Sequence, residues 1–78
     1  MKIVLTGAMT QTRDKMYQNF SRCGITVMAG VSGKIDYLVT GDAPGASKRL
    51  QAKAKGVTIL TEDEFNEKLL EEYPEYLL

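Results

Sequence analysis

The stretch KIVLTG, residues 2–7, lies near the start of the chain and has the character of a central strand. Its aliphatic residues 3–5 follow one another without polar alternation, which is typical of a parallel strand covered on both faces. Thr6 and Gly7 then stand at the carboxyl end of this strand. Open α/β sheets bind ligands at the carboxyl ends of their strands. The turn after Thr6 is therefore the first candidate for a ligand site.

Beyond this strand, segments with helical spacing alternate with short segments rich in β-branched residues. The alternation predicts a mostly parallel sheet with helices on its faces, and right-handed crossovers place the first strand inside that sheet. We expect helices over 13–22, 46–55 and from residue 62 toward Tyr73, and further strands over 25–29, 37–40 and 57–60. These elements describe an α/β fold.

Local signals mark the faces and starts of the predicted helices. Ala46, Leu50 and Ala54 share one face of the second helix. Thr61 and Glu64 match a capping box at the start of the third, in which each side chain binds a backbone amide at the other residue. The third helix should turn its apolar residues inward.

The length of 78 residues allows one small domain over 1–78, with a core of about 2–70 and an acidic tail at 71–78. Apolar residues make up 44% and charged residues 26%, as in ordinary globular proteins. No apolar run reaches the length of a membrane span or of a signal-peptide core. We therefore expect a cytoplasmic or nucleoid protein, nuclear in a eukaryote, that is not secreted and has no membrane partner.

The net charge of zero conceals two oppositely charged segments. Residues 1–61 hold nine Lys and Arg against three Asp and Glu, a net +6, and residues 62–78 carry a net −6. A basic body can mark a nucleic-acid-binding face. The acidic end is explained equally well as the solvated outer face of a last helix.

Catalytic and metal-binding patterns are absent from the sequence. There is no histidine, and the single cysteine, Cys23, falls on the apolar stripe of the first helix, as a buried thiol would. Neither an internal disulfide nor the usual structural zinc site is possible. Residues 41–48 lack the spacing of a nucleotide-binding P-loop. We expect no enzyme, cofactor or metal.

Two basic residues stand where helix dipoles disfavour them. Lys48 lies in the first turn of its predicted helix, where a cation costs a few tenths to about 1 kcal/mol, and Arg13 opens the first helix. Helix starts attract phosphate, and a bound anion would remove the conflict. Taken singly, each basic side chain is more often simply a solvated charge. With Thr6 and Gly7, they could form a four-point phosphate site.

The chain resembles a BRCT domain from Lys2 to about Leu70. The likeness is greatest to the BRCT modules of bacterial NAD-dependent DNA ligases and of the large subunit of the eukaryotic clamp loader, replication factor C. It is carried by an ordered set of motifs: LTG at 5–7, RD at 13–14, Gly24, VSGK at 31–34, DYLV at 36–39, Gly41, GASK at 45–48, AKGV at 54–57 and EF at 64–65.

The resemblance implies a four-stranded parallel sheet in the order 2-1-3-4, flanked by three helices, two on one face and one on the other. In that family the hydroxyl and glycine after the first strand and a lysine in the second helix hold a phosphate, a role that would fall on Thr6, Gly7 and Lys48. Arg13 matches an arginine of members that bind 5′-phosphorylated DNA ends.

The chain also departs from the family pattern. It has no tryptophan in the last helix, so Phe65 and Leu69 must fill that space, and the glycine pair after the first helix appears as Gly24-Ile25. A single unit lacks the second repeat that tandem domains use to recognise phosphopeptides.

These observations predict a non-catalytic DNA-binding module that recognises a 5′-phosphate at a DNA end or nick, in replication, repair or ligation. Four further basic residues are candidate contacts to the DNA backbone: Lys34, Arg49, Lys53 and Lys55. The alternative is a phosphopeptide- or protein-interaction module, an adaptor for a phosphoprotein or a replication or repair protein, with weak self-association as a homodimer.

Overall fold

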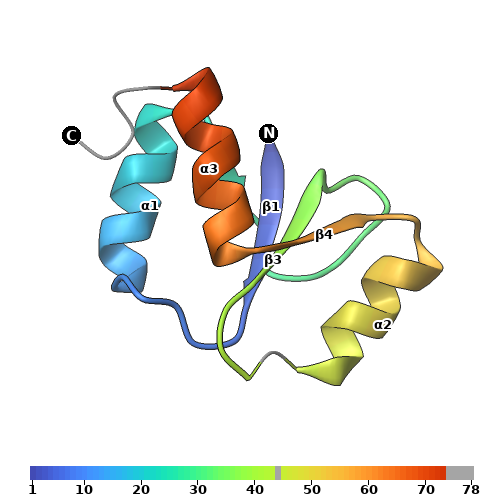
Figure 1. Ribbon diagram of the computed structural model, residues 1–78. Coiled ribbons are helices and arrows are strands. Elements are labelled where there is room, and N and C mark those ends of the chain that lie inside the picture. Colours follow the sequence, from blue (N-terminus) through green and yellow to red (C-terminus); the bar gives the residue numbers. More distant parts are fainter. Residues whose placement is uncertain (44, 74–78) are drawn as a thin grey trace.

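The computed structural model describes residues 1–43 and 45–73, in which strands and helices alternate (Figure 1). The elements are β1 (Lys2–Thr6), α1 (Arg13–Arg22), β2 (Thr26–Val27), β3 (Tyr37–Thr40), α2 (Ala46–Ala54), β4 (Thr58–Thr61) and α3 (Glu62–Glu72). The bounds of α1 and β3 are those predicted. Strand β2 is shorter than the predicted 25–29, and β4 begins one residue later than expected.

The four strands form one parallel sheet in the order β2-β1-β3-β4. This confirms both the strand order implied by the resemblance and the interior position of β1. In the register, Thr6 pairs with Thr40, and Thr40 pairs with Thr61. Three threonines thus stand side by side where β1, β3 and β4 end.

The larger part of the core lies between the sheet and the helices α1 and α3. Eight buried side chains form it: Ile3, Leu5, Met16, Phe20, Ile25, Val39, Phe65 and Leu69. The rings of Phe20 and Phe65 meet edge to face, with centroids 5.8 Å apart. Phe65 and Leu69 fill the space predicted for them. Cys23, predicted to be a buried thiol, is only half-buried at the end of α1 and packs against this cluster.

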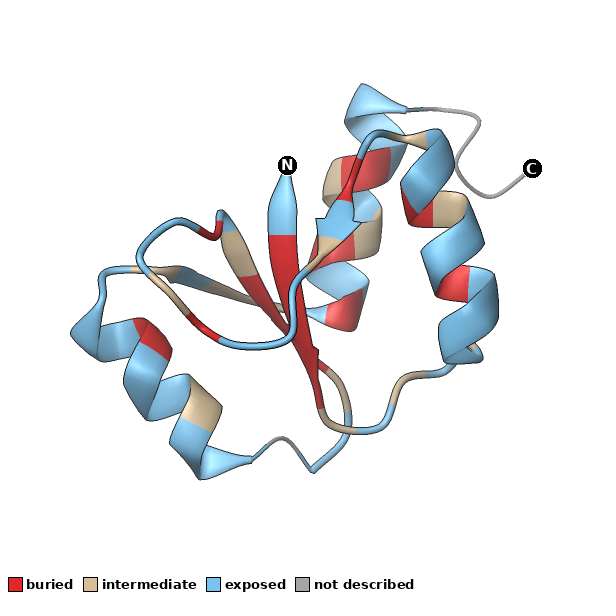
Figure 2. Ribbon diagram, turned by 180° about the vertical axis from the view of Figure 1, so that it is seen from behind, coloured by how far each residue is buried: buried red, intermediate tan, exposed pale blue. Residues whose placement is uncertain are grey.

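Helix α2 covers the other face of the sheet with a thinner core, made of Val4, Val31, Ile35, Leu38 and Ala52. Ala52 is the buried residue of α2, and its small side chain lets the helix approach the sheet closely. The predicted apolar face points the wrong way, because Ala46, Leu50 and Ala54 are exposed. Leu50 is 65% exposed. Figure 2 shows burial concentrated in the sheet and on the inward helix faces.

Side-chain caps fix where α1 and α3 begin. Thr12 accepts a hydrogen bond from the Lys15 amide at the start of α1. At the start of α3 the predicted capping box is present, with the Thr61 amide donating to Glu64 Oε1 at 3.0 Å and the Glu64 amide donating to Thr61 Oγ1 at 3.1 Å.

The C-terminal end of the chain is described only as far as residue 73. Residues 71 and 72 of the predicted acidic tail continue α3, and positions 74–78 lie outside the described residues. None of the helices in the described ranges is long and apolar enough to cross a membrane.

Candidate phosphate-binding site

Thr6, Thr40 and Thr61 lie side by side at the carboxyl edge of the sheet. The hydroxyls of Thr40 and Thr61 make hydrogen bonds within the domain. Thr40 Oγ1 donates to the Leu60 carbonyl at 3.3 Å, and Thr61 Oγ1 caps α3. Thr6 is 7% exposed; within residues 1–43 and 45–73 its hydroxyl makes no hydrogen bond, and it is not among the buried polar atoms left without a partner. The Thr6 hydroxyl is thus able to donate a hydrogen bond to a ligand at this edge.

Two glycines let the loops after β1 and β3 lie against each other. Gly7 has φ +85°, and a Cβ added there would lie 2.7 Å from the Asp42 carbonyl oxygen. A Cβ on Gly41 would collide with the Ala8 carbonyl. Between them, Ala8 and Asp42 exchange two backbone hydrogen bonds of 2.8 Å each. The backbone beside Gly7 is therefore held tightly, and only glycine fits at either position.

Helix α2 begins next to the Thr6 hydroxyl. A Cβ added to Gly45, the N-cap of α2, would lie 3.9 Å from Thr6 Oγ1. Glycine has no side chain to cap the helix, and the first turn of α2 contains no acidic residue. The first amides of α2 and the positive end of its dipole are thus open to an anion, with half-buried Lys48 in the same turn.

The peptide before α2 is strained. Ala43 has φ +48°, a left-handed conformation that alanine rarely adopts. Such strain costs on the order of 1 kcal/mol and persists in binding loops where the surroundings impose it.

Arg13 is the first residue of α1 and is exposed. Helices α1 and α2 begin at the same edge of the sheet but pack on opposite faces (Figure 1). The edge therefore brings Thr6, Gly7 and the start of α2 together, and Arg13 begins the helix on the opposite face of the sheet. In the described part of the chain, neither Arg13 nor Lys48 is in an ion pair; that part contains one pair, Lys68 with Glu72.

The ion pair between Lys68 and Glu72 lies on α3, far from this edge. Lys68 Nζ also lies 5.6 Å from the centroid of the Tyr37 ring. Hydrogen bonding to Tyr37 and the nearby Glu72 carboxylate raise the pKa of Lys68 above its usual value. These contacts support the packing of α3 on β3 and have no part in the candidate site.

The four predicted DNA-backbone contacts are spread along α2 and beyond it. Arg49 and Lys53 are exposed one turn apart on α2. Lys55 stands at the end of that helix, and its Nζ donates to the Val31 carbonyl at 3.1 Å. Lys34 lies before β3, near the amino ends of the strands. The structure therefore does not bring Lys34 or Lys55 to the edge where Thr6 lies.

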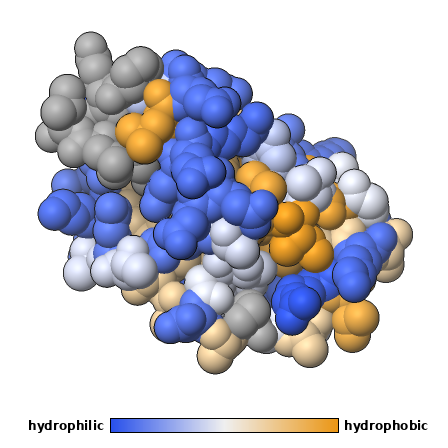
Figure 3. Space-filling model, in the orientation of Figure 1, coloured by the Kyte–Doolittle hydropathy of each residue, from blue (hydrophilic) through white to orange (hydrophobic). Residues whose placement is uncertain are grey.

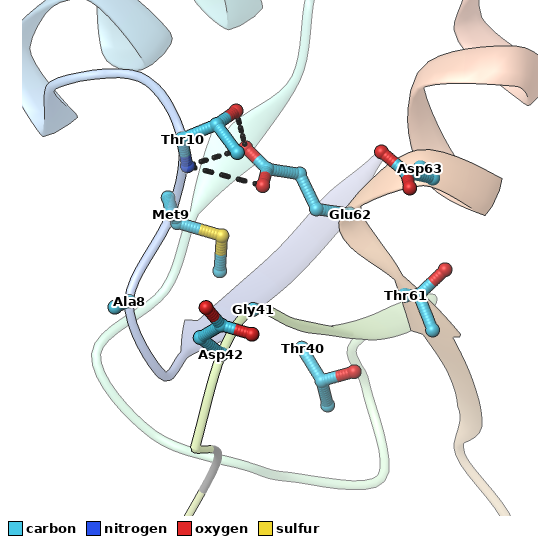
Figure 4. Close-up of a pocket in the computed structure, with 9 residues that line it drawn as sticks. All are labelled: Ala8, Met9, Thr10, Thr40, Gly41, Asp42, Thr61, Glu62 and Asp63. Carbon is cyan, nitrogen blue, oxygen red and sulfur yellow. Dashed lines mark hydrogen bonds between the residues drawn. The ribbon is translucent and has the colours of Figure 1, made fainter.

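An acidic pocket of about 460 Å³ opens beside this edge, between the β1–α1 loop and the start of α3 (Figure 4). Its residues are Ala8, Met9, Thr10, Thr40, Gly41, Asp42, Thr61, Glu62 and Asp63. Glu62 is 7% exposed and accepts hydrogen bonds from the amide and hydroxyl of Thr10. Within residues 1–43 and 45–73, no three His, Cys, Asp or Glu side chains are grouped to hold a metal ion.

Sequence reasoning missed Glu62. The capping box at Thr61 identified it as the first residue of a helix, where a carboxylate is ordinary. Nothing in the local sequence points to its partner Thr10, which lies 52 residues away.

Comparison with known proteins identifies the family. The family model described as the BRCA1 C Terminus (BRCT) domain matches residues 1–67. The chain is similar to the DNA ligase of Ruthia magnifica subsp. Calyptogena magnifica, with 43% identity over 68 residues. It is 46% identical over 65 residues to the DNA ligase of Oleidesulfovibrio alaskensis, and 39% identical over 69 residues to that of Helicobacter pylori strain P12.

These matches cover most of this chain and little of each relative. They span 87%, 82% and 88% of the chain, but 11%, 9% and 10% of the three ligases. A BRCT domain is a non-catalytic module that binds DNA or proteins, and the catalysis of a ligase lies elsewhere in its chain. From the family match over residues 1–67 and the sheet order β2-β1-β3-β4, we conclude that this chain belongs to the BRCT domain family.

Proposed function

We propose that this BRCT domain recognises the 5′-phosphate at a DNA end or nick. The observation that carries the proposal is the position of the Thr6 hydroxyl, which makes no hydrogen bond within the described residues and lies beside the uncapped start of α2. A phosphoryl group supplies oxygens that accept hydrogen bonds from such donors. We call the space between Thr6, Gly7 and the first turn of α2 the phosphate notch.

In the notch, hydrogen bonds and charge act together. The Thr6 hydroxyl and the Gly7 amide donate to phosphate oxygens from one side, and the first amides of α2 donate from the other. Lys48 supplies a positive charge on a flexible stem. A bound phosphate would also remove the unfavourable placing of Lys48 at a helix N-terminus, which costs a few tenths to about 1 kcal/mol.

Arg13 favours DNA over a phosphopeptide as the ligand. By the resemblance, Arg13 matches an arginine of members that bind 5′-phosphorylated DNA ends, and its charge suits a terminal phosphate better than an internal phosphodiester. The similarity to DNA ligases supports the same choice and a role in ligation, replication or repair. We expect it to act where DNA is, in the cytoplasm and nucleoid or in a nucleus.

The DNA beyond the terminal phosphate would run along α2. Arg49 and Lys53 are exposed there and can reach successive backbone phosphates, and Lys34 and Lys55 lie farther from the notch. Backbone contacts give salt-sensitive binding with little sequence preference.

Fluorescence anisotropy with two duplexes that differ only in the 5′-phosphate tests the proposal. The domain should bind the phosphorylated duplex more tightly, and Lys48→Met should reduce this preference. Lys53→Met is the matched control, because it should weaken binding to both duplexes equally. Equal affinity of the unaltered domain for the two duplexes would reject recognition of a terminal phosphate.

A phosphoserine or phosphothreonine peptide offers the notch the same phosphoryl group. The alternative function, an adaptor for phosphoproteins, therefore predicts that such a peptide displaces phosphorylated DNA at comparable concentration. Under the DNA proposal, the peptide competes only weakly, because it lacks the backbone phosphates that face α2.

A further inference from the structure

The loop between β1 and α1, residues 7–12, carries Gly7 at its start and leads into Arg13 at its end. Three sets of hydrogen bonds anchor it. Ala8 exchanges backbone bonds with Asp42 next to Gly7, and Thr12 caps α1 at the far end. Between these two anchors, Thr10 bonds to Glu62 of α3. The proximal and distal halves of the loop are thus held by different partners.

The middle anchor is the buried Glu62 carboxylate, which accepts hydrogen bonds from both donors of Thr10, its amide and its hydroxyl. The Thr10 amide lies 3.1 Å and 3.2 Å from the two oxygens of Glu62, and the Thr10 hydroxyl lies 2.9 Å from Oε2. Figure 4 shows the Glu62 carboxylate reaching the amide and hydroxyl of Thr10 beside the acidic pocket. In the described residues, this is the only side-chain hydrogen bonding between the loop and α3.

Glu62 itself is held rigidly. It is the first residue of α3 and directly follows Thr61, whose capping box with Glu64 fixes the start of the helix. The helix N-terminus favours its negative charge. Because a charged acceptor with two oxygens binds the amide and hydroxyl together, it selects one conformation of the loop around Thr10.

We infer that Glu62 is a positioning residue for the phosphate notch. It does not touch the phosphate; it holds the distal half of the loop so that Arg13 is directed toward the notch. This inference rests on the proposed function. Gly7 is held instead by the Ala8–Asp42 pair, and Lys48 belongs to α2. Glu62 should therefore be coupled energetically to Arg13 and independent of Lys48.

A double-mutant cycle on the full 78-residue chain measures this coupling. The quantity measured is the preference for 5′-phosphorylated over unphosphorylated duplex in anisotropy titrations. Glu62→Ala should lower the preference several-fold, by about as much as Arg13→Gln. Combining the two should cause little further loss. Lys48→Met should reduce the preference by the same factor with Glu62 present or replaced.

Glu67→Ala is the matched control, because it removes the same charge from the exposed face of α3. It should leave the preference unchanged. A second pair of variants keeps the test decisive if Glu62→Ala lowers stability: Thr10→Val, which removes the hydroxyl from an exposed loop residue, and Thr10→Ser, which keeps it. Thr10→Val should reduce the preference for the 5′-phosphorylated duplex, and Thr10→Ser should retain it.

The outcomes separate this inference from the proposed function. If the unaltered chain shows no preference for the 5′-phosphate, the proposed function fails and the role of Glu62 fails with it. If the preference exists but Glu62→Ala behaves like Glu67→Ala, the positioning role alone is wrong. It is equally wrong if Arg13→Gln has the same effect in both backgrounds. Merely structural support by Glu62 would weaken the contributions of Arg13 and Lys48 alike.

Discussion

At the scale of single residues, the carboxyl edge depends on two positions without a Cβ. Gly7 has φ +85° and lies against the Asp42 carbonyl, and Gly41 lies against the Ala8 carbonyl. These contacts bring the β1–α1 and β3–α2 loops together and leave Thr6 and the start of α2 facing one another. The phosphate notch therefore depends on close packing of backbone as much as on its polar side chains.

Replacing either glycine by alanine should destabilise the domain. In Gly7→Ala, a strained φ adds to a backbone clash, so we expect the free energy of unfolding to fall by about 2 kcal/mol or more. Gly33→Ala is the control, because a Cβ there meets nothing within 4 Å. It should change stability by less than about 0.5 kcal/mol. Urea denaturation measures both, and similar losses for the two variants would contradict this account of the loops.

At the scale of elements, the three helices contribute unequally to the core. Helices α1 and α3 bury large side chains against the sheet, including Phe20, Phe65 and Leu69. Helix α2 buries only Ala52 among its described residues and exposes Leu50. Figure 3 shows hydrophobic side chains at the surface near α2, bordered by hydrophilic ones. The helix that opens at the phosphate notch is thus the one least fastened to the sheet.

A pair of leucine truncations tests this difference. Leu69→Ala empties a fully buried site and should lower the free energy of unfolding by about 2–5 kcal/mol. Leu50→Ala removes a side chain that is 65% exposed and should change it by less than about 0.5 kcal/mol. Chemical denaturation compares the two. A large loss at Leu50 would mean that α2 packs through the face predicted from its spacing.

At the scale of the whole molecule, charge is divided between the body and the C-terminal segment. The basic residues of α2 lie on the face of the sheet opposite α3, which carries Asp63, Glu64, Glu67, Glu71 and Glu72. A phosphate backbone is attracted to the first of these surfaces and repelled by the second. The net charge of zero therefore does not argue against DNA binding.

The salt dependence of DNA binding should report this division. We expect affinity for duplex DNA to fall as the salt concentration rises, with log K linear in log salt. Arg49→Gln should reduce the magnitude of the slope by about 1, through loss of one backbone contact, and leave the preference for a 5′-phosphate unchanged. Arg22→Gln, an exposed residue at the end of α1, should leave the slope unaltered. An unchanged slope for Arg49→Gln would exclude α2 as the DNA path.

The sequence alone determined the features that depend on neighbours along the chain. The apolar run in β1, the threonine cap of α3, and the inward stripe with Phe65 and Leu69 all follow from local periodicity and hydrogen-bonding chemistry. The class of fold follows from their alternation. The family motifs then supplied the strand order, which local patterns leave open.

Only the tertiary structure decided which distant groups meet. It turned Leu50 to solvent, because the small Ala52 is the residue that fits between α2 and the sheet. It engaged Lys55 with the Val31 carbonyl and joined Thr10 to Glu62, 52 residues away. These contacts arise where parallel crossovers bring separate loops to one edge of a sheet, and no periodicity in the chain records that meeting.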